Sequence, residues 1–461
     1  MPSCAEDLEA TYAAHLDAVM RRTALALEAS GFESLLIHSG TPPLVFLDDQ
    51  HYPFKVNAPF KLWAPLTGVA DCFVYFEPGS RPRLLFHRPT DFWHKAADLP
   101  DAYWTRHFDL RAIPDRAAAR GHLPEDLRRT AYLGDGLPEL LRWGIGALNP
   151  EHLTARLDFD RAAKTPYELR CMREASKQGV RGHLAAADAF SGGATEFEIE
   201  LAFLRGCGQR EQDLPYNPII ALNSAASVLH YQVLERKAPA RRHSMLIDAG
   251  SEFAGYASDI TRTYSHADAD FATLVSEMDL VQQALCTSVH AGVDWRDVHL
   301  SSHRLVAELL QDSGITNCDA DEAVAIGLSS VFLPHGLGHL LGLQVHDVGG
   351  FLSGPEGAEI PRPEGHPYLR LTRVLEENFV VTMEPGLYFI DQLLEQARAD
   401  HRGSRINWDR VEQFRPFGGI RIEDNLAVKA TGCENLTRDA FAEAEAGTIS
   451  VLFEPTDALA K

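Results

Sequence analysis

The sequence predicts an α+β protein built from two unequal domains. The chain has 461 residues, which is too long for one ordinary hydrophobic core. Short apolar runs alternate with turn residues and helical patterns over the first part of the chain, as in a mixed α/β domain of about 160 residues. Near residue 165 a strong helix-start signal opens a longer region of glycine-punctuated strands and helices. We therefore expect domains at 1–160 and 161–445, followed by a tail at 446–461.

Composition and charge exclude several classes of protein. Hydrophobic residues make up 45% and charged residues 23% of the chain, as in soluble globular proteins. No apolar stretch is long enough for a membrane span, and the acidic N-terminus lacks the pattern of a secretory signal. We therefore expect a cytoplasmic protein. The formal charge of −22 would repel a polyphosphate backbone, so nucleic acid is not an expected partner.

The cysteines do not indicate a disulfide framework or a zinc–cysteine site. The seven are scattered singly, their number is odd, and no two form a C-x-x-C pair. We interpret them as buried or surface thiols.

The first domain should begin with a helix and continue as a sheet. Apolar residues recur at helical spacing over the first 30 residues, for example Leu8, Tyr12 and Leu16. Strands are expected at the apolar runs 35–37, 73–76 and 84–86. Further helical patterns lie at 124–127 and 137–143.

The second domain should open with two capped helices. Thr165-Pro166-Tyr167-Glu168 combines an N-cap threonine, proline at the first helical position and glutamate three residues after the cap. Thr195-Glu196-Phe197-Glu198 repeats the threonine–glutamate spacing after a glycine break. A further helix is expected from about 271 to 290. The segment 391–406 carries no obvious motif. We expect it to be a loop and assign it no role.

Two aspartates at strand ends form the first candidate metal ligands. Asp248 ends an apolar strand, and Asp259 follows eleven residues later. If Glu252-Phe253-Ala254-Gly255 is a hairpin turn, the two aspartates lie directly opposite each other on one face. Two such charges are unfavourable without a cation or a proton between them, and a metal is the economical explanation. The alternative is a pair of solvated strand aspartates.

Three histidines within twelve residues form a second cluster. They are His335, His339 and His346, with glycines around the first two that allow close backbone approach. Isolated histidines are usually satisfied core or surface residues. A cluster of this kind can instead supply one metal ligand, with the other two as supporting donors or transition-state stabilisers.

Two glutamates emerge from apolar strands and complete the set. Glu384 precedes Pro385-Gly386, and Glu423 follows Gly418-Gly419-Ile420-Arg421-Ile422. Either could simply pair with an arginine such as Arg421, because a buried carboxylate needs a partner. Four carboxylates and one imidazole together suit manganese, cobalt, iron or zinc in paired sites. Two ions about 3.5–4 Å apart can hold and acidify a shared water, which predicts a hydrolase.

The ordered motifs resemble those of a known enzyme family. D-x10-D, P-H-G-L-G-H, L-Q-V-H-D-V, E-P-G and G-G-I-R-I-E-D occur in the order found in the pita-bread metallopeptidases. The chain is most similar to the bacterial Xaa-Pro dipeptidases, or prolidases, including relatives that also hydrolyse organophosphates. The similarity runs from Phe46 to Arg438 and so covers nearly the whole chain. The resemblance implies a pita-bread catalytic domain and the hydrolysis of dipeptides whose second residue is proline.

The resemblance also implies roles for the clustered residues. Two divalent ions, usually manganese, would hold a bridging hydroxide and bind to Asp248, Asp259, His339, Glu384 and Glu423. Asp259 and Glu423 would bridge the ions, and Glu384 would also be the general base. His346 matches the position that stabilises the tetrahedral intermediate, and His335 a position that supports the ligands.

Substrate recognition and assembly are implied in the same way. His230 and Arg370 match positions that receive the C-terminal carboxylate of the dipeptide, and Arg421 and Tyr216 are expected to support the substrate site. The family suggests a homodimer, in which Asp49 and Trp93 would reach the active site of the partner. Asp49 would then pair with the free amine of the dipeptide, and Trp93 would limit peptide length. Alternatively, Asp49 belongs to a surface turn and Trp93 to the core of its own domain.

Three other functions stay open at this point. An Xaa-Pro aminopeptidase of the same fold would act on longer peptides. A pita-bread binding protein would have lost catalysis, against which the complete ligand set argues. Organophosphate hydrolysis would be a side activity of the same hydroxide.

Overall fold

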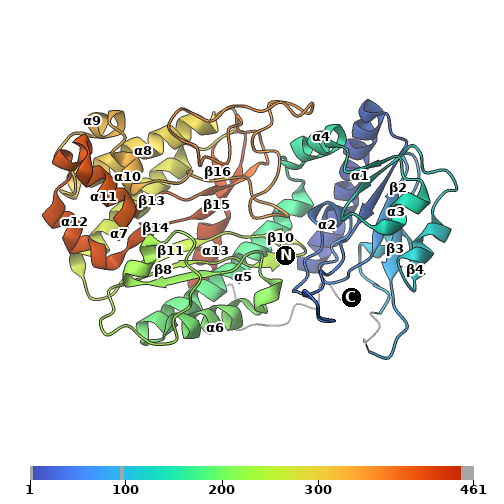
Figure 1. The fold of residues 1–461 in the computed structure, drawn as a ribbon, viewed down its shortest axis with the longest axis horizontal. Helices are drawn as coiled ribbons and strands as arrows, with labels where there is room; N and C mark the ends of the chain where they lie inside the picture. The colour runs from blue at the N-terminus through green and yellow to red at the C-terminus, as the bar shows by residue number, and fades with distance from the viewer. Residues whose placement is uncertain (1–3, 94–97, 448–461) are drawn as a thin grey trace.

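The computed structural model describes residues 4–93 and 98–447 and shows two lobes side by side along the long axis (Figure 1). The smaller lobe holds a six-stranded sheet in the order β4-β3-β2-β1-β5-β6. Its strands are β1 (Ser34–His38), β2 (Phe73–Phe76), β3 (Arg83–His87), β4 (Asp109–Ile113), β5 (Thr130–Leu133) and β6 (Ala147–Leu148). β2 runs antiparallel to β1 and to β3, whereas the other three pairings are parallel. The mixed α/β lobe expected from the sequence is confirmed.

Both faces of this sheet are covered. Leu35 and Ile37 of β1 pack with the helices α1 (Cys4–Ser30), α2 (Ala58–Trp63) and α4 (Glu151–Arg161). Leu36 points the other way and packs with α3 (Pro138–Trp143). The alternation follows from the two-residue period of a strand, and it places continuous apolar strands between two helical layers.

Most expected elements of the smaller lobe are present, and one is not. The first helix, the three strands and the helix near 137–143 are confirmed. The helix expected at 124–127 is wrong, because these residues form no regular element and lead into β5. The Arg120 guanidinium donates to the carbonyls of Pro124 and Glu125 at 2.9 and 2.8 Å. A side chain thus satisfies acceptors that a helix would have paired internally.

The larger lobe opens with the two capped helices that the sequence predicts. α5 (Pro166–Ser191) and α6 (Glu196–Cys207) both begin with a complete capping box. In α5 the Thr165 N–H donates to Glu168 Oε2 at 2.8 Å, and the Glu168 N–H donates back to Thr165 Oγ1 at 3.4 Å. The buried His15 of α1 also contacts Thr165 Oγ1 at 2.8 Å. The start of α5 is therefore tied to the smaller lobe.

Strands of the larger lobe form small sheets that meet around one centre, and the helices pack outside them (Figure 1). The strands are β7 (Ile219–Leu222), β8 (Ser244–Asp248), β9 (Glu252–Phe253), β10 (Tyr256–Ala257), β11 (Thr261–Ser265), β12 (Val380–Met383), β13 (Gly386–Tyr388), β14 (Gly419–Arg421), β15 (Asp424–Val428) and β16 (Cys433–Asn435). The remaining α-helices are α7 (Ala269–Thr287), α8 (Trp295–Asp312), α9 (Ala320–Ala325), α10 (Ser329–Phe332), α11 (Asp391–Ala399), α12 (Trp408–Phe414) and α13 (Leu436–Glu445). A bridge between Thr261 and Glu423 joins the β11-β8-β7 sheet to the segment between β14 and β15.

The hairpin after β8 differs in register from the expectation. Phe253 pairs with Tyr256 across a two-residue turn, Ala254-Gly255, in which both φ angles are positive, at 53° and 91°. Asp248 is consequently opposite Thr261 and not opposite Asp259. A two-residue turn with two positive φ angles matches the twist of the strands, and glycine adopts such an angle without strain, which is why the turn forms one residue later than expected and has Gly255 at its second position. The shift of two residues leaves both aspartates on the same face.

Two further expectations concern later segments. The helix expected near 271–290 is confirmed as α7. The segment 391–406 is not a loop, because it forms α11 and a 3₁₀ turn (His401–Arg405), with Leu394 and Ala397 buried on one side. The expected tail at 446–461 lies almost wholly outside the described residues. Among the described residues, no helix combines the length and low polarity needed to cross a membrane.

Candidate metal centre and active site

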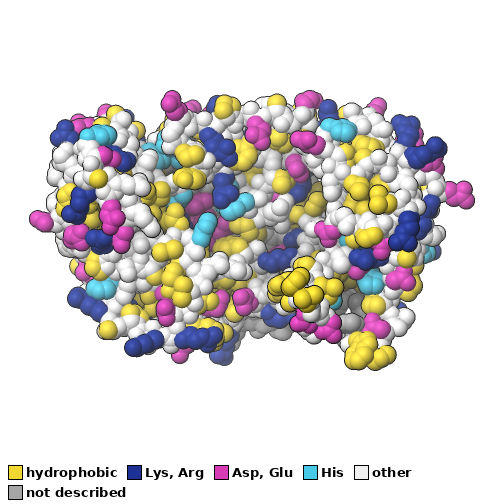
Figure 2. All heavy atoms as spheres, viewed as in Figure 1, with side chains coloured by type: hydrophobic (Ala, Val, Ile, Leu, Met, Phe, Trp, Pro, Cys, Tyr) yellow, Lys and Arg dark blue, Asp and Glu magenta, His cyan; other side chains and the backbone are white. Residues whose placement is uncertain are grey.

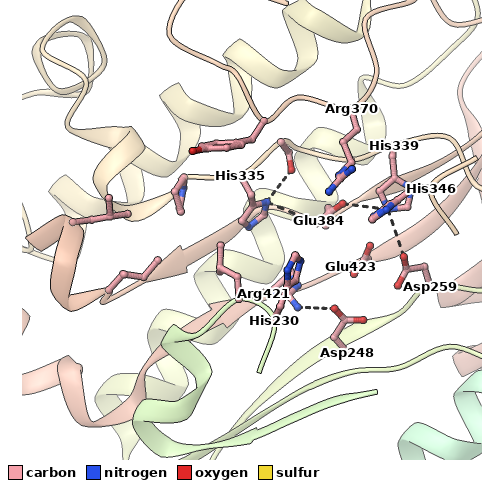
Figure 3. Close-up of a pocket in the computed structure, with 17 residues that line it drawn as sticks. His230, Asp248, Asp259, His335, His339, His346, Arg370, Glu384, Arg421 and Glu423 are labelled. Atoms are coloured by element: carbon pink, nitrogen blue, oxygen red, sulfur yellow. Dashed lines mark hydrogen bonds and ion pairs between the residues drawn. The ribbon is translucent and has the colours of Figure 1, made fainter. Parts of the chain in front are cut away.

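A cavity of about 460 Å³ lies at the centre of the larger lobe. Figure 2 shows acidic and histidine side chains together in the hollowed middle of this face, and Figure 3 shows the labelled side chains converging from several strands and loops. Ten of the residues singled out in the sequence line it: His230, Asp248, Asp259, His335, His339, His346, Arg370, Glu384, Arg421 and Glu423. Tyr216 lines an adjoining cavity that shares Asp248 and Asp259.

The two aspartates meet at Tyr216. The Tyr216 hydroxyl lies 2.8 Å from Asp248 Oδ1 and 2.6 Å from Asp259 Oδ1. One hydroxyl carries one proton and can donate to only one of these oxygens at a time. The other contact then joins two lone pairs unless a proton or a cation lies nearby. Burial and the neighbouring charge of Asp259 raise the pKa of Asp248, although Arg421 opposes the shift.

His339 presents a lone pair to two acids. Its Nδ1 lies 2.9 Å from the Leu340 carbonyl and so carries the ring proton in the neutral form. The opposite nitrogen, Nε2, faces Asp259 Oδ2 at 3.5 Å and Glu384 Oε1 at 3.6 Å. Three electron-rich atoms therefore point at one space. Despite its burial, the two carboxylates raise the pKa of His339.

Glu384 and Glu423 lie just beyond the ends of β12 and β14. Burial raises the pKa of Glu384 to about 7, with the charges of Asp259 and Asp248 adding to the shift. Burial and the same acids raise the pKa of Glu423 well above its usual value. Glu423 accepts a hydrogen bond from Thr261 Oγ1 at 2.6 Å. The sequence left open that Glu384 or Glu423 pairs with Arg421. Arg421 instead forms its ion pair with Asp248, at 2.7 Å.

Arg421, Tyr388 and His335 form a hydrogen-bonded chain. Arg421 Nη1 donates to the Tyr388 hydroxyl at 2.9 Å. The His335 Nδ1 lies 2.8 Å from the Gly336 carbonyl, and its Nε2 lies 2.8 Å from the Tyr388 hydroxyl. A carbonyl can only accept, so the ring proton of neutral His335 is assigned to Nδ1, which donates to Gly336, and the Tyr388 hydroxyl donates to Nε2. Burial lowers the pKa of His335 to about 4, so this ring is neutral near pH 7.

The backbone around His339 fits closely against β12. The Thr382 N–H donates to the His339 carbonyl at 3.0 Å, and the His339 N–H donates to Thr382 Oγ1 at 3.1 Å. A Cβ on Gly338 would lie 2.1 Å from the Thr382 carbonyl oxygen. Only glycine permits this approach, which explains why the P-H-G-L-G-H motif has a glycine directly before His339.

The rim of the cavity carries exposed side chains that can meet a ligand. His230, His346 and Arg370 are exposed, and Figure 3 shows Arg370 and His346 on one side of the acids and His230 beside Arg421. The His346 ring stands edge-on to that of His339, with centroids 4.4 Å apart. Although part of His346 is exposed, the surrounding cavity wall removes water from its ring, and this desolvation, together with the positive neighbours His339 and Arg370, lowers the pKa of His346 to about 4. The following residue, Asp347, anchors this segment through ion pairs with Arg161 and Lys164.

Asp49 and Trp93 do not reach this cavity in their own subunit. Asp49 lies in an exposed turn, and Trp93 is 79% exposed, so the alternative that Trp93 belongs to the core of its domain is wrong. The ring of Trp93 lies at a tilt against that of Phe92, which is also exposed, with centroids 4.6 Å apart. Phe46 and Leu47 beside Asp49 are 85% and 90% exposed.

Several residues in or beside the cavity were not found from the sequence. Tyr388 and Thr261 connect the acids and bases by hydrogen bonds, yet single hydroxyl residues in strands carry no recognisable signal. Ile390 and Leu393, around the start of α11, form an apolar wall. The segment 391–406 thus contributes to the cavity.

The residues fit a centre for divalent cations. One ligand atom each from Asp259, His339 and Glu423 lie within 4.8 Å of one another. Asp248 and Glu384 line the same cavity and complete the set of candidate ligands. In the part of the chain that the structure describes, Arg421 is the arginine that forms an ion pair with this set, through Asp248. Four carboxylates beside one arginine leave a strong negative excess in a partly dry space, which bound cations would neutralise.

Comparison with known proteins decides the family. Residues 10–159 match the model of the Xaa-Pro dipeptidase N-terminal domain, and residues 170–430 match the model of metallopeptidase family M24. The chain belongs to family M24. This confirms the pita-bread fold expected from the motifs, and M24 membership implies divalent metals.

Curated relatives of this M24 chain cover nearly its full length. The Xaa-Pro dipeptidase of Shewanella oneidensis is 48% identical over 428 residues, covering 93% of this chain and 98% of that protein. The Xaa-Pro dipeptidase of Aeromonas hydrophila is 47% identical over 431 residues, with 93% and 98% covered. Among solved structures, Pseudomonas aeruginosa aminopeptidase PepP has a TM-score of 0.70 at 22% identity, covering 94% of this chain and 97% of that one. Zinc-substituted Escherichia coli aminopeptidase P has a TM-score of 0.69 at 22% identity, with 95% and 99% covered. These two share the M24 fold.

Proposed function

We propose that this cavity hydrolyses the peptide bond before proline in dipeptides. The observation that carries the proposal is the convergence of four carboxylates and His339 in one cavity that His230, His346 and Arg370 also line. The family and the activity named for its curated relatives support the same reaction, and the chain is a metal-dependent hydrolase of Xaa-Pro dipeptides. A cavity of about 460 Å³ is of the size that encloses a small ligand.

Asp248, Asp259, His339, Glu384 and Glu423 would hold two divalent ions, which we propose to be Mn²⁺ because oxygen ligands predominate. Ions bound there supply an acidified water and an electrophilic contact for the substrate carbonyl. The remaining steps belong to side chains of this chain.

Glu384 is proposed as the general base and acid. One of its oxygens accepts the proton of the attacking water and later returns it to the proline nitrogen. The nitrogen needs this proton because it would otherwise have to leave as a strongly basic amide anion, and the proton becomes the N–H that the nitrogen of an Xaa-Pro bond lacks.

His346, His335, His230 and Arg370 are proposed to handle the charges of the substrate. The neutral His346 ring donates to the oxygen that becomes negative in the tetrahedral intermediate. His335 keeps its tautomer through Gly336 and supports the cavity wall. Arg370 and His230 receive the C-terminal carboxylate, for which a guanidinium offers two parallel donors. Tyr216 and Arg421 support this site by holding Asp248.

The smaller lobe is proposed to measure peptide length across a homodimer. Asp49 would bind the free amine of a dipeptide in the partner's cavity, and Trp93 would narrow that cavity. Phe46, Leu47 and Phe92 beside them are large apolar residues that stand exposed in the single chain, as expected of a surface that a second subunit covers.

Turnover of Ala-Pro and Ala-Pro-Ala in added Mn²⁺ tests the function. A dipeptidase hydrolyses Ala-Pro and leaves Ala-Pro-Ala intact, because the longer peptide meets the wall that Trp93 and Asp49 form. Preferential turnover of Ala-Pro-Ala would instead identify an Xaa-Pro aminopeptidase, and turnover of neither peptide with metal bound would identify a binding protein. Organophosphate hydrolysis and a cytoplasmic location stay predictions.

A further inference from the structure

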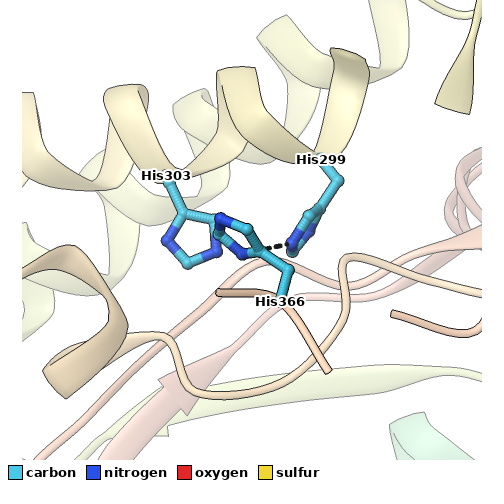
Figure 4. A group of neighbouring side chains, drawn as sticks. All are labelled: His299, His303 and His366. Atoms are coloured by element: carbon cyan, nitrogen blue, oxygen red, sulfur yellow. Dashed lines mark hydrogen bonds between the residues drawn. The ribbon is translucent and has the colours of Figure 1, made fainter. Parts of the chain in front are cut away.

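A second cluster of metal-ligating side chains lies outside the cavity. His299 and His303 lie one turn apart on α8, and His366 faces them from the segment before Arg370 (Figure 4). One ring nitrogen from each histidine lies within 4.8 Å of those of the other two. The centroids of His299 and His303 are 4.8 Å apart, and each lies 4.6 Å from that of His366. Residues four apart on a helix share one face, so α8 presents two imidazoles to the third.

Hydrogen bonds within the chain do not satisfy this cluster. His299 Nε2 lies 2.9 Å from His366 Nδ1, and His303 Nδ1 lies 3.1 Å from Ser329 Oγ. Among the residues that the structure describes, His299 Nδ1 and His303 Nε2 have no partner. Both side chains are almost completely buried, at 1% and 2% exposure. Buried ring nitrogens that lack partners are uncommon, because they lose their bonds to water without replacement.

The three rings are in the state that binds metal. Burial and the neighbouring histidines lower the pKa of His303 to about 3, and burial also lowers the pKa of His299 and His366. Neutral imidazoles keep a free lone pair at one nitrogen, which is the form that ligates a cation.

We propose that His299, His303 and His366 form a third metal site, which takes a borderline divalent ion such as Zn²⁺. Three neutral imidazoles without a carboxylate favour Zn²⁺, Ni²⁺ or Cu²⁺ over the harder Mn²⁺. The site therefore differs in chemistry from the carboxylate-rich cavity. His366 is half-buried and its neighbours in the sequence are exposed, which gives an ion a way in from that side.

A metal at this site would join α8 to the segment that carries Arg370. Tyr368 and Arg370, two and four residues after His366, both line the active-site cavity. His335 of the cavity wall also acts electrostatically on His299 and His303, so the two sites are neighbours. Binding at the histidine site would fix the position of His366 and so limit the movement of the substrate-binding segment.

Metal content of the chelated and reloaded enzyme tests the site. The wild type dialysed against Zn²⁺ should retain one equivalent more per chain than His303→Gln or His366→Gln. His401→Gln, which changes an exposed histidine outside the cluster, should match the wild type. Equal zinc content in the wild type and both cluster variants would overturn the proposal. If His303→Gln fails to fold, His366→Gln decides, because that residue lies in a partly exposed segment.

A spectroscopic measurement separates this site from the cavity. In the background Asp259→Asn/Glu423→Gln, one equivalent of Cu²⁺ should show electron paramagnetic resonance splitting from three nitrogens. Addition of His303→Gln should abolish that three-nitrogen signal. A three-nitrogen signal that persists in this triple variant assigns the copper to other histidines and overturns the proposal. Neither outcome depends on dipeptide hydrolysis, so the function of the cavity and the histidine site are tested separately.

Discussion

At the residue scale, the cavity is defined by an excess of negative charge that the chain itself does not neutralise. Asp248 has Arg421 as a partner at 2.7 Å, whereas the Glu423 carboxylate, among the residues that the structure describes, accepts its side-chain hydrogen bond from the Thr261 hydroxyl. Burial raises the pKa of both Glu423 and Glu384, and the negative charges of the neighbouring acids raise it further, because both effects favour the neutral form. We propose that the same residues, which repel one another in the metal-free chain, serve as ligands when cations bind.

Loss of a ligand charge should remove metal and activity together. Asp248→Asn and Glu423→Gln should each lower the retained metal and reduce Ala-Pro turnover by at least about 100-fold, since ligand charge holds the ions. Metal analysis after dialysis measures the first effect and a proline assay the second. Asp213→Asn, at an exposed ion pair with Arg210, is the matched control and should change neither. Full metal occupancy with unchanged turnover would remove both residues from the site.

Arg370 should act on the substrate carboxylate alone. Arg370→Ala should raise KM for Ala-Pro by about 10- to 100-fold, the loss expected for a two-pronged charged hydrogen bond. It should change hydrolysis of the C-terminal amide of Ala-Pro little, because that substrate has no carboxylate. The control is Arg362→Ala, since Arg362 lies on the same segment and donates to the Leu369 carbonyl at 2.7 Å. Equal losses on both substrates for Arg370→Ala would assign Arg370 to the structure of the segment.

At the scale of elements, the helix starts are positioned by short local signals and then joined to distant parts of the chain. α5 and α6 have the same capping box, but only Thr165 also contacts a buried histidine of the other lobe. The same capping sequence therefore only starts the helix in α6, whereas in α5 it also connects the two lobes. α11 shows the reverse case, because a helix with no capping side chain forms where Leu394 and Ala397 pack into the core.

The two capping threonines should differ in their contribution to stability. Thr195→Ala should lower the free energy of unfolding by about 1 kcal/mol, the usual value of an exposed cap. Thr165→Ala should cost more, because it removes the cap and leaves the buried His15 Nδ1 without its partner. Urea denaturation measures both losses. Thr165→Ser keeps the hydroxyl and should recover most of the difference, and equal losses for the two alanine variants would contradict the coupling.

At the scale of the whole molecule, the pKa values of two acids near the junction of the lobes are shifted in opposite directions. Burial favours the neutral form of Asp347, but Arg161 and Lys164 outweigh it and lower its pKa. Burial raises the pKa of Asp158 to about 6. Asp347 immediately follows His346, so this junction also positions a side chain of the cavity.

The pH dependence of stability should reveal this opposition. A folded pKa below the unfolded value of about 4 means that Asp347 stabilises the protein above that pH and loses its contribution as the pH falls. The stability difference between wild type and Asp347→Asn should therefore be constant at neutral pH and shrink below about pH 4. Asp158 should behave oppositely, so that wild type gains on Asp158→Asn as the pH falls from 6 to 4. Urea denaturation across this range measures both, and changes of the same sign would contradict the assignment.

The proposed dimer should show complementation between subunits. Asp49→Ala chains keep their metal ligands, and Glu423→Gln chains keep Asp49. In a mixed dimer, the intact metal centre of the first chain would face Asp49 of the second, so mixing should restore Ala-Pro turnover at one of the two sites. Failure to recover activity in dimers shown to have exchanged subunits would count against action across the interface.

The helix starts, the fold class and the candidate ligands, whose roles stay a proposal, were predicted from the sequence. Each is a pattern that a short segment carries by itself: a charged residue at the end of an apolar strand, a threonine–proline–glutamate cap, or glycines around a histidine. Such patterns depend on contacts between residues close in the chain, so the local structure that each one predicts depends little on the rest of the fold. The order of the motifs added the family.

Other features were decided by the tertiary structure. The turn at Ala254-Gly255 moved the partner of Asp248 by two residues, since strand twist selects the turn and sequence patterning on one face fits both registers. Three contacts join residues that are far apart in the chain. They are the ion pair of Arg421 with Asp248, the hydrogen bond between Tyr388 and His335, and the contact of His366 with His299 of α8. Contacts of this kind depend on how packed elements approach in space, and the spacing of residues along one segment carries no record of that approach.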